Sequence, residues 1–409
     1  MKNIIILFLA LLTQHLMGQP IGPEVKWVVN LHNTYSAKFT SDDKYIVAND
    51  GGMLMVIDAE SGSILRQRNL TETIYAIDLM DNDSIIVCAG SRNIVKFLNF
   101  YTLDTVKMIR NYEVSIGSIN HFDITNDNKI IALNCSQRKV VIYDLENNKV
   151  IKEFTSNNPD YFKIKYCDND NKLAIALSES VLILDTKTYS LVKDIGGGSR
   201  TTPVLDFDIS SDETKLITCA DDGKIMIWDL ISGDKIDEYD IDIGIDLRAV
   251  KYLLDNQKII YSGGGSIRTT VIDITNKKRL YRNEQLQSRG FEISHDNKYI
   301  LLVEGGSYVL LDVDKILSVP GYDNPVDSII YPNPGENIIT IEIQISKPVQ
   351  IEYSIYNETG INVKKGIKGI TDTGISSLQF DISSLSDGIY FIELRYDNSI
   401  KRYKFIKGS

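Results

Sequence analysis

The sequence has few of the residues that usually catalyse reactions or hold metal ions. It contains four histidines, four cysteines and two tryptophans among 409 residues. Cys88, Cys135, Cys167 and Cys219 lie far apart, and there is no CxxC pair, GxSxG motif or histidine-rich cluster. These absences exclude a zinc knot and argue against the common nucleophilic and metal-dependent hydrolases. We therefore expect no metal site and no cofactor, and we expect the cysteines to be buried free thiols.

Positive charge and long apolar runs are also scarce. The net charge is −11, and no basic cluster stands out, so nucleic acid is not an expected partner. One apolar run, Ile4 to Leu12, follows Lys2 near the start of the chain. Nine residues are too few to span a bilayer but are typical of a secretory signal peptide. We expect a signal peptide over residues 1–18, and no later segment that could form a transmembrane span.

The most informative feature that is present is a repeat. Seven times a short apolar run ends in an acidic or amide residue, followed by a turn and a second β-rich run. The seven markers are Asp58, Asn99, Asp144, Asp185, Asp229, Asp273 and Asp312, with spacings of 41, 45, 41, 44, 44 and 39 residues. A period of about 40–45 residues with four short strands per unit is the signature of a β-propeller. The sequence therefore predicts an all-β fold whose main part is a seven-bladed propeller.

Each predicted blade has the same order of elements. A first strand is followed by a polar turn, a second strand, a third strand that ends at the marker residue, and a charged outer strand. The blades are predicted to begin near Tyr35, Ile74, Ser118, Tyr161, Val204, Leu247 and Arg289. The seventh blade lacks an outer strand of its own, and the segment from Val25 to Val29 is unassigned. We predict that this segment supplies the missing strand and closes the ring.

On these features, the region from about Val25 to Val319 resembles WD-repeat and YVTN-type seven-bladed propellers. One blade carries the WD dipeptide, Trp228-Asp229, after the turn and strand DDGKIMI. The Gly-His dipeptide of standard WD repeats is absent, so the His-Ser-Asp-Trp network of that family is not expected. The resemblance implies a fold and a scaffold for binding, and it does not identify a partner.

The composition changes after Val319. Pro320-Gly321 and Asn324-Pro325 indicate a linker over 320–330, and six β-rich segments follow between Ile338 and Lys407. Their alternating pattern predicts a small Ig-like β-sandwich. The expected domains are thus a propeller over 19–319, the linker, and a C-terminal domain over 331–409.

The C-terminal domain resembles the type A C-terminal sorting domain of type IX secretion substrates. The matching motifs are Tyr-Pro-Asn-Pro at its start, IYNETG, LSDGIYFIEL and the basic final strand KRYKFIK. The residues that carry the resemblance are Tyr331, Pro332, Asn333, Pro334, Gly360, Leu385, Asp387, Gly388, Tyr390, Lys401, Arg402, Lys404 and Lys407. The resemblance implies that the partners include the type IX secretion machinery and its sortase. It also implies passage through the periplasm, and a secreted or outer-membrane-surface location.

The candidate binding site is one mouth of the propeller channel, where the first strand of each blade begins. The residues at this position include aromatic and arginine side chains, which often dominate binding energy at interfaces. The predicted mouth residues are Tyr35, Tyr75, Asn120, Tyr161, Phe162, Arg248 and Arg289. We expect them to bind a surface protein or a glycan. The same side chains could instead pack between blades.

The sequence also allows three other interpretations. Acidic turns such as Asp168 to Asn171 could bind calcium, but Asp and Asn at this place in most blades are typical of tight turns. An extracellular hydrolase or lyase with its site on a propeller face is a second function, although no catalytic residues stand out. A structural component of an envelope complex is a third.

Overall fold

The computed structural model describes residues 23–408 apart from short segments, and it consists almost entirely of β-strands. The segments that it does not describe are 111–116, 137, 156–160, 178, 197–201, 242–246, 254–255, 265–267, 284–285, 319–329, 332–336, 346–347, 359, 371–373 and 397–398. The predicted signal peptide, residues 1–18, lies outside the described residues. Apart from the segment Ile272–Tyr281, the first compact unit ends at Val319 and the second begins at Pro320.

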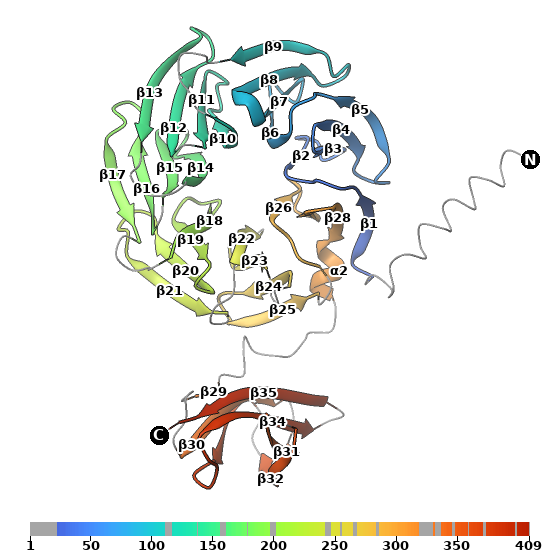
Figure 1. Cartoon of the computed structure of the whole chain (residues 1–409), viewed down its shortest axis with the longest axis vertical. Helices are drawn as coiled ribbons and strands as arrows, with labels where there is room; N and C mark the ends of the chain where they lie inside the picture. The colour runs from blue at the N-terminus through green and yellow to red at the C-terminus, as the bar shows by residue number, and fades with distance from the viewer. Residues whose placement is uncertain are drawn as a thin grey trace, which may run out of the picture. The chain divides into compact units, whose positions relative to one another are not determined.

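The first unit is a seven-bladed propeller, as the repeat predicts (Figure 1). Six blades are consecutive four-stranded antiparallel sheets. Their strands are β2 (Ala37–Phe39), β3 (Tyr45–Asp50), β4 (Met53–Asp58) and β5 (Ile64–Asn69); β6 (Ile74–Met80), β7 (Ile85–Gly90), β8 (Ile94–Asn99) and β9 (Thr105–Arg110); β10 (Ile119–Ile124), β11 (Ile130–Cys135), β12 (Lys139–Asp144) and β13 (Lys149–Thr155); β14 (Tyr161–Cys167), β15 (Lys172–Leu177), β16 (Ser180–Asp185) and β17 (Leu191–Ile195); β18 (Val204–Ile209), β19 (Lys215–Ala220), β20 (Lys224–Asp229) and β21 (Lys235–Asp240); β22 (Leu247–Leu253), β23 (Lys258–Gly263), β24 (Thr270–Asp273) and β25 (Lys278–Arg282). Every blade begins within two residues of its predicted start.

The seventh blade is completed by the N-terminal strand. β26 (Gly290–Ile293), β27 (Tyr299–Glu304) and β28 (Ser307–Asp312) form its inner part, and β1 (Val25–Asn30) pairs antiparallel with β28 as the outer strand. A short helix, α2 (Val313–Ser318), follows where an outer strand would otherwise continue. The indole of Trp27 on β1 donates a 2.9 Å hydrogen bond to the carbonyl of Ala59 in the first blade. The prediction that this segment closes the ring is confirmed, and closure leaves no free sheet edge at the junction.

The marker residues owe their regular spacing to a repeated turn. Each marker is the last residue of a third strand, and its side-chain oxygen accepts backbone N–H groups two or three residues later. In the first blade, Asp58 Oδ1 accepts from Ser61 N at 2.8 Å, and in the fifth, Asp229 Oδ1 accepts from Ser232 N at 2.7 Å. An Asx turn of this kind directs the chain into the outer strand. The repeat thus reflects turn chemistry, and only Trp228 adds the indole of a WD repeat, donating to Thr218 Oγ1 at 3.0 Å.

Apolar side chains fill the spaces between neighbouring blades. One cluster joins the first and seventh blades through residues such as Phe39, Ile57, Tyr308 and Leu310. Tyr308 is fully buried, and its hydroxyl donates to the Ser36 carbonyl at 2.8 Å. All four cysteines are free and buried within these layers, as predicted.

The second unit is a small two-sheet sandwich, also as predicted. One sheet has the order β29 (Ile330–Tyr331), β30 (Ile338–Ile345) and β33 (Gly374–Asp381), and the other has the order β32 (Asn362–Ile370), β31 (Val349–Asn357), β34 (Gly388–Tyr396) and β35 (Ser399–Lys407). Ile341, Ile355, Phe380, Ile392 and Phe405 are among the buried residues of its core. Because the core is small, the domain is expected to be only marginally stable.

Candidate functional site

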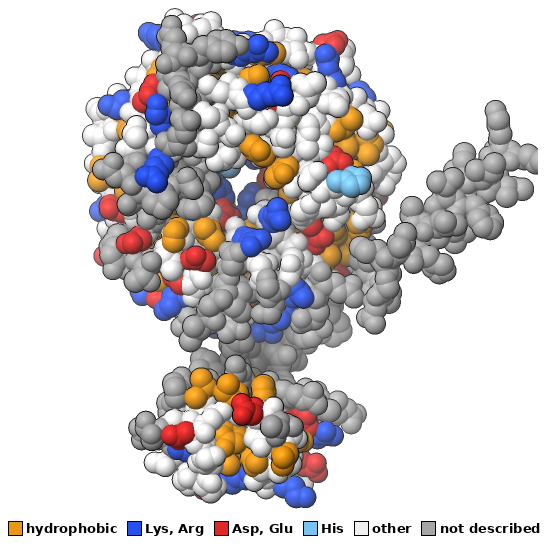
Figure 2. Space-filling model, viewed as in Figure 1, with side chains coloured by type: hydrophobic (Ala, Val, Ile, Leu, Met, Phe, Trp, Pro, Cys, Tyr) orange, Lys and Arg blue, Asp and Glu red, His pale blue; other side chains and the backbone are white. Residues whose placement is uncertain are grey.

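The first strands of the seven blades line a channel through the propeller. The cavity inside it measures about 340 Å³. Figure 2 shows the central opening, with charged side chains inside it and basic side chains on its rim. A concave space of this size is within the range of small-ligand sites. We call the end at which the first strands begin the mouth.

The structure brings most of the predicted mouth residues together. Tyr35, Tyr75, Asn120, Arg248 and Arg289 all line the channel cavity. Among them Tyr35, Asn120, Arg248 and Arg289 are exposed. The backbones of Tyr161 and Phe162 lie at the start of β14, but their side chains are outside the described residues.

The mouth residues form one continuous arc. Arg248 and Arg289 belong to the sixth and seventh blades, and Tyr35 and Tyr75 belong to the first and second. The two tyrosine rings meet edge to face, with centroids 5.2 Å apart and an interplanar angle of 82°. Tyr35 nevertheless keeps 41% of its surface exposed. The mouth therefore presents two guanidinium groups beside an aromatic pair, which are residue types suited to binding anionic and ring-shaped groups.

A second pocket adjoins the mouth between the sixth and seventh blades. It measures about 380 Å³ and shares Arg248 and Arg289 with the channel. The rest of its lining comes from the end of β23, the residues before β26, and the turn between β27 and β28. These residues are Gly263, Gln287, Ser288, Glu304, Gly305, Gly306 and Ser307. We call this space the side pocket.

Below the mouth, every blade contributes a charged residue at the same position of its first strand to the channel wall. These seven residues, which we call the charge ring, are Lys38, Asp78, Asp123, Lys165, Asp208, Lys251 and Glu292. Two blades add a second charged residue, Lys163 and Asp206, which lie 2.7 Å apart. These residues are not among the predicted site residues. The available signal was a charged residue between apolar neighbours in each first strand, as in FDI and FEI.

Most of the charge ring is internally compensated. Glu292 lies 3.3 Å from Lys38 and 3.0 Å from Lys251. Burial disfavours its charged form, but the two ammonium groups outweigh burial and lower the pKa of Glu292 to about 2. On the other side of the channel Lys165 Nζ lies 2.8 Å from Asp208, and the pKa of Asp208 is likewise lowered to about 2, since lysine charges outweigh burial.

Asp78 and Asp123, on the second and third blades, differ from the other members. Among the described residues neither makes an ion pair. Burial raises the pKa of Asp123 to about 7, and the charge of Asp78 adds to the shift. Burial also raises the pKa of Asp78, although Lys38 opposes this. On the same strand as Asp123, burial lowers the pKa of His121 to about 3, so its imidazole is neutral.

The channel carboxylates also connect the blades. Asp123 accepts the backbone N–H of Tyr166 in the next blade at 2.6 Å, and Asp208 accepts that of Tyr252 at 3.1 Å. These N–H groups lie on innermost strands, which have no neighbouring strand on the channel side. The acidic residues therefore satisfy backbone donors that the fold would otherwise leave unpaired.

At the opposite end of the channel, the turns of neighbouring blades hold one another. The turn between the first and second strands of every blade contains at least one residue with a left-handed backbone. One such residue from each turn belongs to a set that we call the turn ring: Asp43, Asp83, Asn128, Asp170, Glu213, Asn256 and Asn297. Asp and Asn tolerate positive φ better than most residues, which explains their recurrence in these turns.

Side chains in these turns bond to the turns of neighbouring blades. Asp83 Oδ2 accepts from Ser41 N at 2.7 Å, and Asp170 Oδ2 accepts from Asn126 N at 2.7 Å. At the ring closure, the two oxygens of Asp43 accept from His295 N and Asp296 N, both at 2.8 Å. Six of the seven blade junctions carry such a bond among the described residues; the other three use Asn128 with Asp81, Glu213 with Asp168, and Asn256 with Ser211.

These bonds are relevant to the hypothesis that the acidic turns bind calcium. The carboxylates of the turn ring point to backbone N–H groups and not to a common centre. Among the described residues, no group of three or more His, Cys, Asp or Glu side chains is placed to hold a metal ion.

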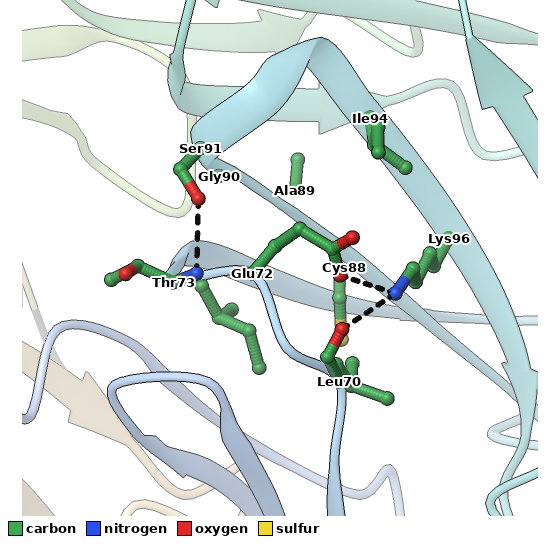
Figure 3. A pocket seen from close by; sticks show the side chains of 10 residues that line it. Leu70, Glu72, Thr73, Cys88, Ala89, Gly90, Ser91, Ile94 and Lys96 are labelled. Carbon is green, nitrogen blue, oxygen red and sulfur yellow. Dashed lines mark hydrogen bonds and ion pairs between the residues drawn. The ribbon is translucent and has the colours of Figure 1, made fainter.

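A further small cavity lies beside the second blade (Figure 3). It measures about 10 Å³, which is room for no more than one water molecule. Lys96 pairs with Glu72 across it and donates to the Leu70 carbonyl at 2.8 Å. Burial raises the pKa of the Cys88 thiol lining it, so this cysteine is unreactive. The cavity is part of the packing and is not a binding site.

In the C-terminal domain, several predicted sorting residues have clear structural roles. Gly360 turns the chain between β31 and β32 with φ of +81°. Tyr390 is buried against Phe405, and its hydroxyl donates to the Ser386 carbonyl at 2.9 Å. Leu385 packs at the edge of the core, and Lys407 lies 3.7 Å from Asp387, next to Gly388. Pro332, Asn333 and Pro334, and the side chains of Tyr331, Lys401, Arg402 and Lys404, lie outside the described residues.

Comparison with known proteins finds matches in both parts of the chain. Residues 329–408 match the family model of the secretion system C-terminal sorting domain. Residues 190–229 match that of the WD domain, G-beta repeat. The chain is thus a WD-repeat-like β-propeller followed by a type IX sorting domain. The sorting domain implies export through the periplasm to the medium or the outer-membrane surface, and it implies the type IX machinery as a partner.

Two individual proteins illustrate the likeness of the propeller. A WD repeat domain-containing protein 83 homolog from Dictyostelium discoideum is 27% identical over 133 residues, which are 30% of this chain and 40% of that protein. The chain thus spans less than half the length of this relative. The crystal structure of the Myceliophteria thermophila Cps50 (Swd1) β-propeller domain covers 70% of this chain and 98% of its own, with 9% identity and a TM-score of 0.61. This likeness shows the fold alone. Within the described residues no helix has the length and apolar character needed to cross a membrane.

Proposed function

We propose that this secreted propeller is a binding module that holds a surface protein or a glycan at its mouth. The observation that supports the proposal most is the arc of exposed Arg248, Arg289 and Tyr35, with half-buried Tyr75 beside Tyr35, around a concave opening. These residue types combine large rigid surfaces with hydrogen-bonding and charged groups. Arg248, Arg289 and Tyr35 are exposed, so a partner can reach them.

The alternative function, an extracellular hydrolase or lyase, would need catalytic residues, and the channel carboxylates are the candidates. Asp78 and Asp123 are the acidic pair best suited to catalysis, because their pKa values are raised. However, Asp123 already accepts the Tyr166 N–H, and Asp78 accepts the Leu79 N–H at 2.9 Å. Both lie below the mouth, within the wall of the ring. A binding role accounts for the exposed residues, and a structural role accounts for the carboxylates.

We further propose how the chain is processed. The signal peptide would be residues 1–18, with cleavage after Gly18. The propeller would extend to residue 319, with a linker over 320–330, and the sorting domain over 331–409 would be removed by the sortase. Mass spectrometry of the protein from the producing cells should find Gln19 at the N-terminus and no peptide beyond residue 330. Mature protein that retains residues 331–409 would contradict this processing.

The binding proposal is tested with the full chain on a glycan array and in a cross-linked pull-down from envelope extracts. The variant is Arg248→Glu with Arg289→Glu, which reverses both charges at the mouth. A matched control, Lys129→Glu with Lys298→Glu, makes the same charge change on exposed side chains at the opposite end. We expect a ligand that the mouth variant loses and the control keeps. A ligand that both variants keep, or no ligand at all, would refute the proposal.

A further inference from the structure

The side pocket has a lining that is unusual for a site that binds protein. Its nine residues are glycine, serine, glutamine, arginine or glutamate, and none of them carries an apolar side chain. Protein partners usually anchor aromatic or aliphatic side chains in apolar pockets. A ligand that presents hydroxyl and charged groups over most of its surface suits this lining better. A sugar unit is such a ligand.

The side pocket also offers two kinds of polar group. Arg248 and Arg289 supply guanidinium donors, which match carboxylate geometry. Glu304 supplies an acceptor: its Oε2 accepts the Ser307 hydroxyl at 2.9 Å, whereas its Oε1 is buried and has no hydrogen-bond partner among the described residues. A buried polar atom without a partner is costly unless a bound group satisfies it. Burial raises the pKa of Glu304.

The turn that carries Glu304 is held in place and shaped to admit Arg289. The Thr34 hydroxyl donates to the Glu304 carbonyl at 2.7 Å, and Leu31 N donates to the Gly306 carbonyl at 2.8 Å. Gly305 lies directly under the Arg289 guanidinium, and a Cβ at Gly305 would come within 3.1 Å of the guanidinium carbon. The absence of a side chain at Gly305 therefore lets Arg289 lie against the turn beside Glu304.

We propose that the side pocket binds an acidic sugar unit of a glycan, with the sugar carboxylate on Arg248 and Arg289 and a sugar hydroxyl donating to Glu304 Oε1. The rest of the glycan would extend across the mouth toward Tyr35 and Tyr75, whose rings suit stacking against sugar faces. This inference rests on the proposed binding function of the mouth, and it specifies the class of ligand.

The test measures affinity by isothermal titration calorimetry with the full chain. The probes are trisaccharides of galacturonate and of glucuronate, their carboxyl-reduced counterparts, and a triglutamate peptide. We expect one of the acidic trisaccharides to bind, and its reduced counterpart to bind at least tenfold more weakly. Glu304→Ala should weaken binding about tenfold, whereas Glu304→Gln should retain most of the affinity, since its carbonyl still accepts a hydroxyl.

Gly305→Ala provides a second, independent variant. Its backbone does not need a positive φ, so the change should leave folding intact while shifting Arg289, and binding should weaken several-fold. Glu146→Ala, an exposed change in a turn of the third blade, is the control and should have no effect.

Three results would overturn the inference: failure of both acidic trisaccharides to bind, an affinity that Glu304→Ala leaves unchanged, or tighter binding of the peptide. If a ligand found on the array is lost in the Arg248/Arg289 variant but is neutral or a peptide, the binding function of the mouth stands and only the ligand class is wrong. If no ligand depends on those arginines, both fail.

Discussion

The turn ring and the mouth lie at opposite ends of the same seven strands, yet they use polar residues differently. At the turn ring, Asp43, Asp83 and Asp170 are engaged by backbone N–H groups of neighbouring blades. At the mouth, Tyr35, Arg248 and Arg289 are exposed, and at the nearby turn one carboxylate oxygen of Glu304 is buried without a partner among the described residues. Polar groups that satisfy one another stabilise a fold, whereas exposed polar groups can be reached by a ligand. The comparison therefore supports a structural role for the turn ring and the proposed binding role of the mouth.

The charge ring lies between these ends. The largest predicted effect, a loss of stability in Glu292→Gln, tests whether the charge ring has a structural role like that of the turn ring. Glu292→Gln leaves Lys38 and Lys251 facing each other without the intervening carboxylate. Removing one partner of a buried ion pair typically costs about 3–5 kcal/mol, and because the Glu292 side chain is 15% exposed we expect a loss of about 2–3 kcal/mol. Urea unfolding followed by tryptophan fluorescence measures it, since both tryptophans, Trp27 and Trp228, lie in the propeller.

A loss below about 0.5 kcal/mol, the size typical of surface changes, would contradict the structural role of Glu292. The exposed Glu146→Gln is the control and should lie within that range. In the absence of urea, the Glu292→Gln variant should still bind ligand at the mouth, because Glu292 is not among the mouth residues.

Substitution of Asp123 by Asn should change the folding stability in the opposite direction to Glu292→Gln. Its pKa is raised to about 7 in the folded protein, so folded Asp123 holds a proton that the unfolded chain releases near pH 4. Stability therefore falls as pH rises between about 4 and 7. Asp123→Asn removes this loss and can still accept the Tyr166 N–H. We expect it to stabilise the propeller by about 2 kcal/mol at pH 8 and by much less at pH 4.5, because one pKa unit corresponds to about 1.4 kcal/mol.

The measurement is urea unfolding of the variant and the original chain at both pH values. If Asp123→Asn were no more stable than the original chain at pH 8, the ionised Asp123 carboxylate would have to be stabilised by groups other than the channel ion pairs. Asp208→Asn is the matched comparison, and it should destabilise at pH 8, because its pKa is lowered to about 2.

A smaller loss is expected at the turn ring. Asp43→Ala removes the acceptor of the His295 and Asp296 N–H groups and places alanine at a φ of +57°. We expect about 1.5 kcal/mol of destabilisation from lost hydrogen bonds and backbone strain. Asp43→Asn tolerates the same φ and keeps one of the two acceptor oxygens, so it should cost less than Asp43→Ala. Reduced ligand binding by folded Asp43→Ala would contradict the division between the two ends.

Sequence reasoning found the parts of this molecule that repeat and the strand that closes the ring, and it missed side-chain pairings between blades. The marker residues are local, since each bonds to its own turn, and their period alone gave the number and starts of the blades. The charge ring has a weak local signal, one charged residue between apolar neighbours, but its pairing depends on which blades become neighbours. Glu304 shows the limit: it is the last residue of β27, and the pocket that it shares with Arg248 forms only once the sixth and seventh blades are neighbours.

The smallest predicted effect on stability is also the most informative about function. Arg289→Gln removes a charge from an exposed side chain at the mouth, so unfolding in urea should change by no more than about 0.5 kcal/mol. Binding should nevertheless weaken at least tenfold, because the remaining amide cannot form the paired bonds of a guanidinium with a carboxylate. Together with Asp43→Ala, this variant forms a reciprocal test, in which one change lowers stability without affecting binding and the other does the reverse. If Arg289→Gln destabilised the propeller as much as Asp43→Ala, the guanidinium would be packing between the blades, and the mouth would be a second structural end.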